Sequence, residues 1–178
     1  RDTQPQCSFI EWRTLRRRTS IDPRCTLAGS RGTYLIWGDS HARALVDGMT
    51  RVVPDGVSVA YVTTYGCSPA YPEKGLSSGI GRQGVRACDQ SNEYAAAAVR
   101  RLRPDIVFLA EQGGHRHRDW DGLARRIRAL GARRVVLVGS TPQWLPSLAR
   151  VIAATHWPYK GEYIATGLDP AVLPGDAL

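Results

Sequence analysis

The stretch from Tyr34 to His41 constrains the fold of this chain more than any other. Four apolar or aromatic residues run directly into Gly38-Asp39-Ser40-His41. The apolar residues that follow have the spacing of one helix face: Leu45, Met49 and Val52. The pattern predicts a buried strand over residues 34–38, a tight turn, and an amphipathic helix over residues 41–53.

Ser40 is expected on that turn, where the strand ends and the helix begins. Ligands of open α/β sheets bind at this edge, and the free N–H groups at the start of a helix favour a developing negative charge. A serine nucleophile needs such a place, because prearranged donors must meet the oxyanion that it creates. Gly-Asp-Ser is also an ordinary turn and helix-cap sequence. The flanking strand and helix are therefore what favour a catalytic Ser40.

Strands and helices alternate along the rest of the chain. Further strands are expected over residues 57–63, 105–110 and 134–139, and further helices over residues 89–103, 120–130 and 147–155, with a long loop over residues 64–87. Alternation of this kind predicts an α/β fold, a three-layer α/β/α sandwich around a parallel sheet. The loops after the first three strands should then gather at one edge of the sheet.

We expect residues 1–30, which are polar and basic, to be an N-terminal extension or linker. Trp12 and Leu15 are apolar side chains that could anchor it on the core. Residues 31–178 are expected to form the domain itself. The chain begins with Arg1 and has no signal peptide, so we expect a fragment of a longer protein.

The composition excludes several classes of protein. A hydrophobic content of 43% and a charged content of 22% are ordinary for a globular domain, and no apolar run approaches the length of a membrane span. The net charge of +8 comes without zinc-finger spacing or an aromatic RNA-binding signature, so no nucleic-acid partner is expected. Arginine-rich, solvated faces explain the charge more simply.

The four cysteines are Cys7, Cys25, Cys67 and Cys88. None belongs to a Cys-x-x-Cys pair, so no metal site is expected. Three pairings are possible, and pairing of sequence neighbours gives Cys7–Cys25 and Cys67–Cys88. Each bond would close a loop of about 20 residues and stabilise the fold by about 3 kcal/mol. Disulfides place the domain outside the cytoplasm; four reduced cysteines in a cytosolic protein are the alternative.

The loops at the predicted edge resemble those of the SGNH (GDSL-like) hydrolase superfamily. Gly38-Asp39-Ser40 matches its nucleophile block. His41, the Gly66-Cys67-Ser68-Pro69 loop and the paired cysteines are similar to one branch, the extracytoplasmic domain fused to the membrane acyltransferase type 3 domain of bacterial polysaccharide and O-antigen O-acetyltransferases. The resemblance covers residues 34–145. It implies a flavodoxin-like sandwich and serine esterase chemistry without a cofactor or metal.

The resemblance also implies roles for single residues. Ser40 would be the nucleophile, with Asp39 supporting the turn. The oxyanion would be held by the N–H of Ser40, by Gly66, and by a side-chain donor after the third strand. That donor is usually an asparagine in the family; here Gln112 or His115 would replace it. The family's general base lies in an Asp-x-x-His block, which the 178 residues lack. We therefore expect the domain's C-terminal end to be missing and this chain to be a poor catalyst; the alternative is that another histidine, His115 first, is the base.

The function expected from these features is transfer of an acyl group, foremost acetyl, to a carbohydrate hydroxyl. An acyl donor, a carbohydrate acceptor and the membrane acyltransferase domain of the parent protein would be the partners. The domain would lie in the bacterial periplasm or at the cell surface, tethered to the inner membrane. Two alternatives stay open: a non-catalytic glycan-binding module that uses Trp37, Trp120, Trp144 or Trp157, and a stand-alone carbohydrate esterase.

Overall fold

A parallel four-stranded sheet forms the centre of the computed structural model, which describes residues 6–11, 13–75, 81–113, 118–139, 144, 147–161 and 164. Its strands are β1 (Gly32–Gly38), β2 (Val57–Thr63), β3 (Ile106–Ala110) and β4 (Arg134–Val138). They lie in the order β2-β1-β3-β4, and every neighbouring pair is parallel. This is the strand order of flavodoxin-like sheets, so the predicted α/β fold is confirmed.

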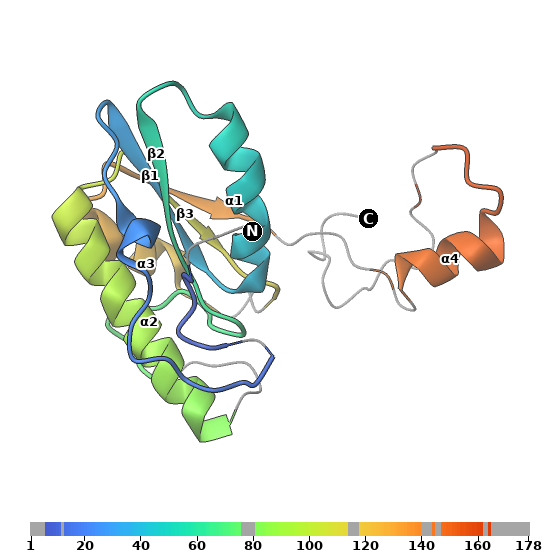
Figure 1. Ribbon diagram of the computed structural model, residues 1–178, viewed down its shortest axis with the longest axis horizontal. Coiled ribbons are helices and arrows are strands. Elements are labelled where there is room, and N and C mark those ends of the chain that lie inside the picture. The colour runs from blue at the N-terminus through green and yellow to red at the C-terminus, as the bar shows by residue number, and fades with distance from the viewer. Residues whose placement is uncertain are drawn as a thin grey trace.

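Helices cover both faces of the sheet. Helix α1 (Ser40–Val52) lies on one face, and α2 (Gly81–Leu102) and α3 (Trp120–Ala129) lie on the other (Figure 1). The chain moves from β1 to β2 in one direction across the sheet and then reverses, so right-handed connections place α1 opposite α2 and α3. Helix α4 (Leu148–Thr155) is drawn apart from the sandwich. Among the described residues, no helix combines the length and apolarity that crossing a membrane requires.

The central strands, β1 and β3, supply the side chains in the middle of the core. Their fully buried side chains come from both faces, as expected for strands covered on both sides: Leu35, Ile36, Trp37, Val107 and Leu109. Trp37 is only 1% exposed, and its indole N–H donates to Asn92 Oδ1 at 2.8 Å. Trp37 is therefore a core residue and has no surface on which a sugar could stack.

Helix α2 begins at Gly81, eight residues before the predicted start at residue 89, so the predicted loop over residues 64–87 is too long. Two glycines, Gly81 and Gly84, occupy these first turns, and glycine weakens a helix locally. Small residues of the same turns, Gly84, Ala87 and Cys88, are buried. Tertiary packing of this small face thus outweighs the local propensity.

The N-terminal segment, residues 6–26, packs against the sandwich. Phe9 and Ile10 are 1% and 2% exposed. The backbone N–H of Thr63, at the end of β2, donates to the carbonyl of Cys7 at 3.2 Å, and the N–H of Phe9 donates to Thr64 Oγ1 at 3.1 Å. The expectation that Leu15 anchors this segment is wrong, because Leu15 is 46% exposed; Trp12 lies outside the described residues.

Residues 9–18 fold back on themselves, and we call them the arginine hairpin. Ile10 and Arg17 pair as an antiparallel bridge. The N–H of Arg18 donates to the carbonyl of Phe9 at 2.8 Å, and the N–H of Glu11 donates to the carbonyl of Arg16 at 3.0 Å. Leu15 falls in the turn between the two arms, which explains its exposure.

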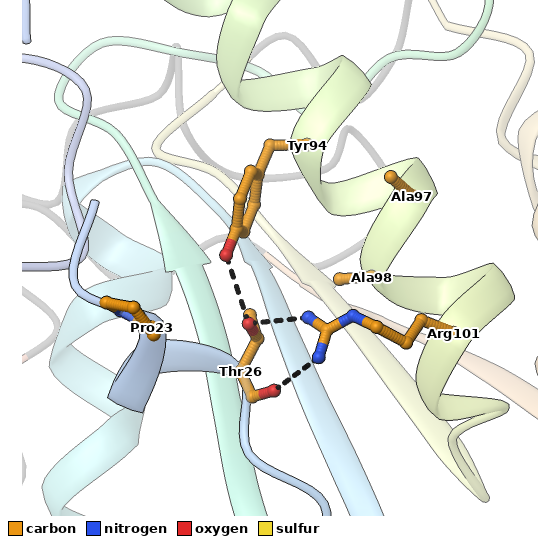
Figure 2. A pocket seen from close by; sticks show the side chains of 6 residues that line it. All are labelled: Pro23, Thr26, Tyr94, Ala97, Ala98 and Arg101. Atoms are coloured by element: carbon orange, nitrogen blue, oxygen red, sulfur yellow. Dashed lines mark hydrogen bonds between the residues drawn. The ribbon is translucent and has the colours of Figure 1, made fainter. Parts of the chain in front are cut away.

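The short 3₁₀ helix η1 (Pro23–Thr26) holds the other end of the N-terminal segment on α2. Arg101 donates to Thr26 twice, at 2.8 Å to the hydroxyl and 3.3 Å to the carbonyl, and Tyr94 contacts the same hydroxyl at 3.2 Å (Figure 2). These side chains line a hollow of about 270 Å³ between η1 and α2. A disulfide joins Cys25 of η1 to Cys7, so both ends of the segment are fixed.

Candidate functional site

The carboxyl ends of β1, β2 and β3 lie side by side. Gly38 pairs with Thr63 of β2 and with Ala110 of β3. Ser40 follows two residues after Gly38, Gly66 three residues after Thr63, and Gln112 two residues after Ala110. The three loops that carry these residues therefore leave the sheet at one edge, as the parallel topology predicted.

Gly38 allows the first of these loops to form. A Cβ atom on Gly38 would lie 1.8 Å from the carbonyl oxygen of Ala110 and 2.8 Å from the Cβ of Ala42. The first of these neighbours is backbone of β3, which cannot move without disturbing the sheet. Only glycine allows β1 to pass so close to β3 at this position, two residues before Ser40.

Asp39 joins two of the loops. Its side chain is buried, and Oδ1 accepts a hydrogen bond from the N–H of His41 at 2.7 Å, which caps α1. Oδ2 accepts from the N–H of Gln112 at 2.8 Å. Each carboxylate oxygen thus binds a backbone amide, one in the first turn of α1 and one in the loop after β3.

Ser40 is the first residue of α1 and is exposed. It borders a pocket of about 350 Å³ that is also lined by Arg43 of α1, Thr63 and Tyr65 from the end of β2, and several residues of the N-terminal segment. Gly66 and Gln112 are not among its lining residues. The described pocket at Ser40 is therefore bounded by residues of the range 6–18. The sequence pattern of these residues did not indicate that they contribute to the site.

The loop after β2 is held on several sides. The N–H of Thr64 donates to the carbonyl of Gly38 at 2.9 Å, and a turn closes at 3.0 Å from the N–H of Cys67 to the carbonyl of Thr64. Gly66 lies inside this turn with φ of 65°, a conformation that favours glycine. A disulfide joins Cys67 to Cys88 of α2. Both disulfides of the structure are those expected from the sequence.

A buried ion pair lies within the loop after β3, and its arginine also contacts the loop after β2. Glu111 is 3% exposed, and its Oε2 lies 3.1 Å from Nη1 of Arg118. Nη2 of Arg118 donates to the carbonyl of Pro69, and the guanidinium lies 4.9 Å from the ring centre of Trp120. Sequence reasoning missed this connection. Its one local signal is an acidic residue placed directly after an apolar strand.

Of the candidate oxyanion donors in the loops after β2 and β3, the structure describes Gly66 and Gln112. The backbone N–H of Gln112 already donates to Asp39, so its exposed side-chain amide is the group that could serve. Gly66 is at the same edge of the sheet. His115 lies outside the described residues, and nothing in the structure bears on its proposed role.

His41 follows Ser40 in the first turn of α1. Its Nδ1 is 3.8 Å from Oδ1 of Asp39, which is beyond hydrogen-bond distance. The pair therefore does not have the geometry of a carboxylate that orients a catalytic imidazole. Within the described part of the chain, no three His, Cys, Asp or Glu side chains are grouped to hold a metal ion.

Arg43 gives the pocket a cationic side. Its Nη1 is 3.3 Å from Oδ1 of Asp47, and its guanidinium lies 5.2 Å from the ring centre of Tyr61. Burial raises the pKa of the Tyr61 phenol, and the charge of Arg43 partly opposes that rise. The phenol consequently stays neutral at physiological pH, and the positive charge of Arg43 is not cancelled by it.

The family follows from the chain as a whole. The family model described as SGNH domain (fused to AT3 domains) matches residues 10–167. The chain belongs to this family. The matched region includes most of the arginine hairpin, all four strands and all three loops of the candidate site, so the predicted resemblance is confirmed.

A solved structure shares the fold of this SGNH domain. It is the periplasmic domain of a lipopolysaccharide acetyltransferase of Salmonella ser. Paratyphi A, which is 18% identical with a TM-score of 0.59. The match covers 83% of this chain and 60% of that structure, so the chain spans less than two thirds of its solved relative. No curated protein matches the chain.

Proposed function

We propose that Ser40 is the nucleophile of an acyl-transfer reaction, with acetyl as the acyl group and a hydroxyl of a cell-surface or secreted carbohydrate as the acceptor. The observation that carries the proposal is the position of Ser40. Its side chain is exposed on the first turn of α1, between two fixed loops and beside a pocket. Membership of a family described as fused to AT3 domains supports acyl transfer in general.

The proposed chemistry has two balanced halves. Oγ of Ser40 attacks the acyl carbonyl, a histidine base takes the hydroxyl proton, and the donor's leaving group departs with that proton. The acceptor hydroxyl then attacks the acyl-enzyme and gives its proton to the base, which passes it to the departing Oγ of Ser40, so that the ester moves to the sugar and the serine hydroxyl is restored. The 178 residues contain no Asp-x-x-His block, so we propose as the base either the histidine of such a block elsewhere in the parent protein or, if the 178-residue chain itself turns over the ester well, His115.

We further propose that the oxyanion is held by the N–H of Ser40, the N–H of Gly66 and the side-chain amide of Gln112, with His115 as the alternative to Gln112. The first donor stands at the start of α1, where the helix dipole also favours negative charge. The Asp39 bridge supports this assignment, since it fixes the loop of Gln112 relative to Ser40.

We place the domain in the bacterial periplasm or at the cell surface, joined to a membrane acyltransferase domain of the same parent protein. Two disulfides in one small domain support an oxidising compartment. We propose no nucleic-acid partner and no cofactor for this reaction.

Hydrolysis of p-nitrophenyl acetate tests the proposal. The parent protein should hydrolyse this ester, and Ser40→Ala should lower kcat by about 10³-fold or more. Ser147→Ala is the matched control, because Ser147 is also exposed at the start of a helix and makes no capping hydrogen bond. The 178-residue chain should be slower than the parent by orders of magnitude. Equal rates for Ser40→Ala and the unaltered protein would disprove the proposal.

A further inference from the structure

The arginine hairpin forms one wall of the pocket at Ser40. Ile10, Glu11 and Arg18 line the pocket from the hairpin, while Arg43 and Tyr65 line it from the sandwich. A volume of about 350 Å³ is at the lower end of the range for small-molecule sites. Beside this wall, the Cys7–Cys25 disulfide joins the start of the N-terminal segment to η1, which Arg101 of α2 holds through Thr26.

The pocket is cationic. Arg18 and Arg43 line it with one acidic residue, Glu11, whose Oε1 is 3.8 Å from Nη2 of Arg18. Arg43 faces Asp47, but that carboxylate is 64% exposed, so solvent weakens the pair. Three more arginines of the hairpin are exposed outside the pocket: Arg13, Arg16 and Arg17. Their summed charge raises the local concentration of anions around the hairpin.

The pocket is also preorganised and has an aromatic side. Arg17 donates to Oε1 of Gln90 on α2 at 2.9 Å, and Gln90 in turn donates to the carbonyl of Thr19 at 2.6 Å. These bonds fix the hairpin against α2 before any ligand arrives. Tyr65 is 46% exposed, which leaves ring surface against which a sugar could pack.

We propose that this pocket is the acceptor subsite and that it selects a carbohydrate carrying an anionic group, a carboxylate or a phosphate. Guanidinium groups bind both of these anions through paired hydrogen bonds. The inference rests on the proposed function, since it gives the subsite its role from the neighbouring Ser40. A concave site with an aromatic side suits a sugar better than a lipid surface, which needs a flat or convex cationic face.

Titrations of the ¹⁵N-labelled 178-residue chain followed by NMR test this inference without turnover. The probes are methyl β-glucuronide, glucose 6-phosphate and methyl β-glucoside, which share a ring and differ in charge. We expect saturable shifts at the amides of Ser40, Arg43 and Tyr65, with a Kd about tenfold lower for at least one anionic probe than for the glucoside. The two anionic arms distinguish carboxylate from phosphate.

Variants inside and outside the pocket test which side chains set the affinity for the probes. Arg43→Gln should raise the Kd of the anionic probe about tenfold and leave that of the glucoside unchanged. Arg51→Gln, an exposed change on the same helix outside the pocket, should change neither. Tyr65→Ala should weaken all three probes, whereas Tyr159→Ala should not, although Tyr159 is similarly exposed at 47%. Well-dispersed spectra of each variant establish that it is folded.

Other outcomes overturn the inference. Equal affinity for the glucuronide, the phosphate and the glucoside would show that the pocket does not select anions. Shifts confined to other surfaces would show that the pocket does not bind the sugar. Salt-sensitive binding to phosphatidylglycerol vesicles, with no saturable shift from any sugar, would assign the hairpin to a membrane instead. Ser40→Ala should bind the probes normally, so loss of ester hydrolysis in that variant tests the proposed function separately.

Discussion

At Gly38 the sheet leaves no room for a side chain, because a Cβ atom would lie 1.8 Å from the carbonyl oxygen of Ala110. We predict that Gly38→Ala lowers the free energy of unfolding by about 1–3 kcal/mol, the usual cost of forcing extra atoms into a packed interior. Urea unfolding followed by circular dichroism measures it.

Gly48→Ala is the control for that substitution. Gly48 lies inside α1, and a Cβ atom there would meet nothing within 4 Å. Removing a glycine from an exposed helix should stabilise the chain by about 0.5–1 kcal/mol. If the two substitutions had the same sign, the close approach of β1 and β3 at Gly38 would be refuted.

Asp39 is expected to hold the turn through its two accepted hydrogen bonds. Asp39→Ala removes the cap of α1 and takes away the acceptor of the Gln112 N–H. We therefore predict a loss of about 2–4 kcal/mol in the free energy of unfolding. Asp39→Asn keeps one oxygen acceptor, so its loss of unfolding free energy should lie between that of Asp39→Ala and zero. Asp47→Ala breaks only an exposed pair and should change stability by less than about 0.5 kcal/mol. A loss for Asp39→Ala as small as that of Asp47→Ala would contradict this account of the turn.

Among the elements, Arg118 pairs with Glu111 inside the loop after β3 and donates to the carbonyl of Pro69 in the loop after β2. Arg118→Met leaves a buried carboxylate without this cation and should destabilise the chain by about 3 kcal/mol. Combining it with Glu111→Gln should cost less than the sum of the single changes by about 1 kcal/mol or more, because the two residues act as a unit. Thermal or chemical unfolding of the four proteins in this cycle gives the coupling.

Arg133→Met provides the comparison. Arg133 pairs with Asp105, and their side chains are 83% and 40% exposed, respectively. We expect a change below about 0.5 kcal/mol there. Strict additivity of the Glu111 and Arg118 changes would show that these two side chains do not stabilise the chain as a unit.

The disulfides stabilise two different elements. Cys67→Ala with Cys88→Ala, and Cys7→Ala with Cys25→Ala, open loops of similar length, with separations of 21 and 18 residues, so each should cost about 3 kcal/mol. Hydrogen exchange should separate them. The first change should speed exchange at Gly66 and Cys67, and the second at the arginine hairpin. The same pattern of exchange in both variants would contradict these separate roles.

The elements also show how far the sequence determines the structure. The apolar run before Gly38 and the cap at Asp39 are local signals, and they placed β1, the turn and α1 within two residues. The predicted start of α2 is too late. Its glycines locally favour a loop, and this part of the helix is stabilised only by the packing of its small residues against the rest of the protein. The packing of the hairpin could not be predicted, since its bonds to Thr64 and Gln90 connect residues more than 50 positions apart.

On the scale of the whole molecule, the reversal of strand order at β1 separates α1 from α2 and α3 and gathers three loops at one edge (Figure 1). The N-terminal segment returns to that same edge and supplies one wall of the pocket at Ser40. The sheet thus positions the proposed nucleophile and donors, while a segment outside the sheet lines the proposed acceptor side.

Trapping of the acyl-enzyme tests the central claim most directly. The parent protein is mixed with p-nitrophenyl acetate, quenched in acid, digested and examined by mass spectrometry. The account predicts one acetyl group on the peptide that contains Ser40, at that residue, and its loss in Ser40→Ala but not in Ser147→Ala. Acetyl transfer that persists in Ser40→Ala, or an acetyl group that accumulates in turnover on a different residue, would contradict it.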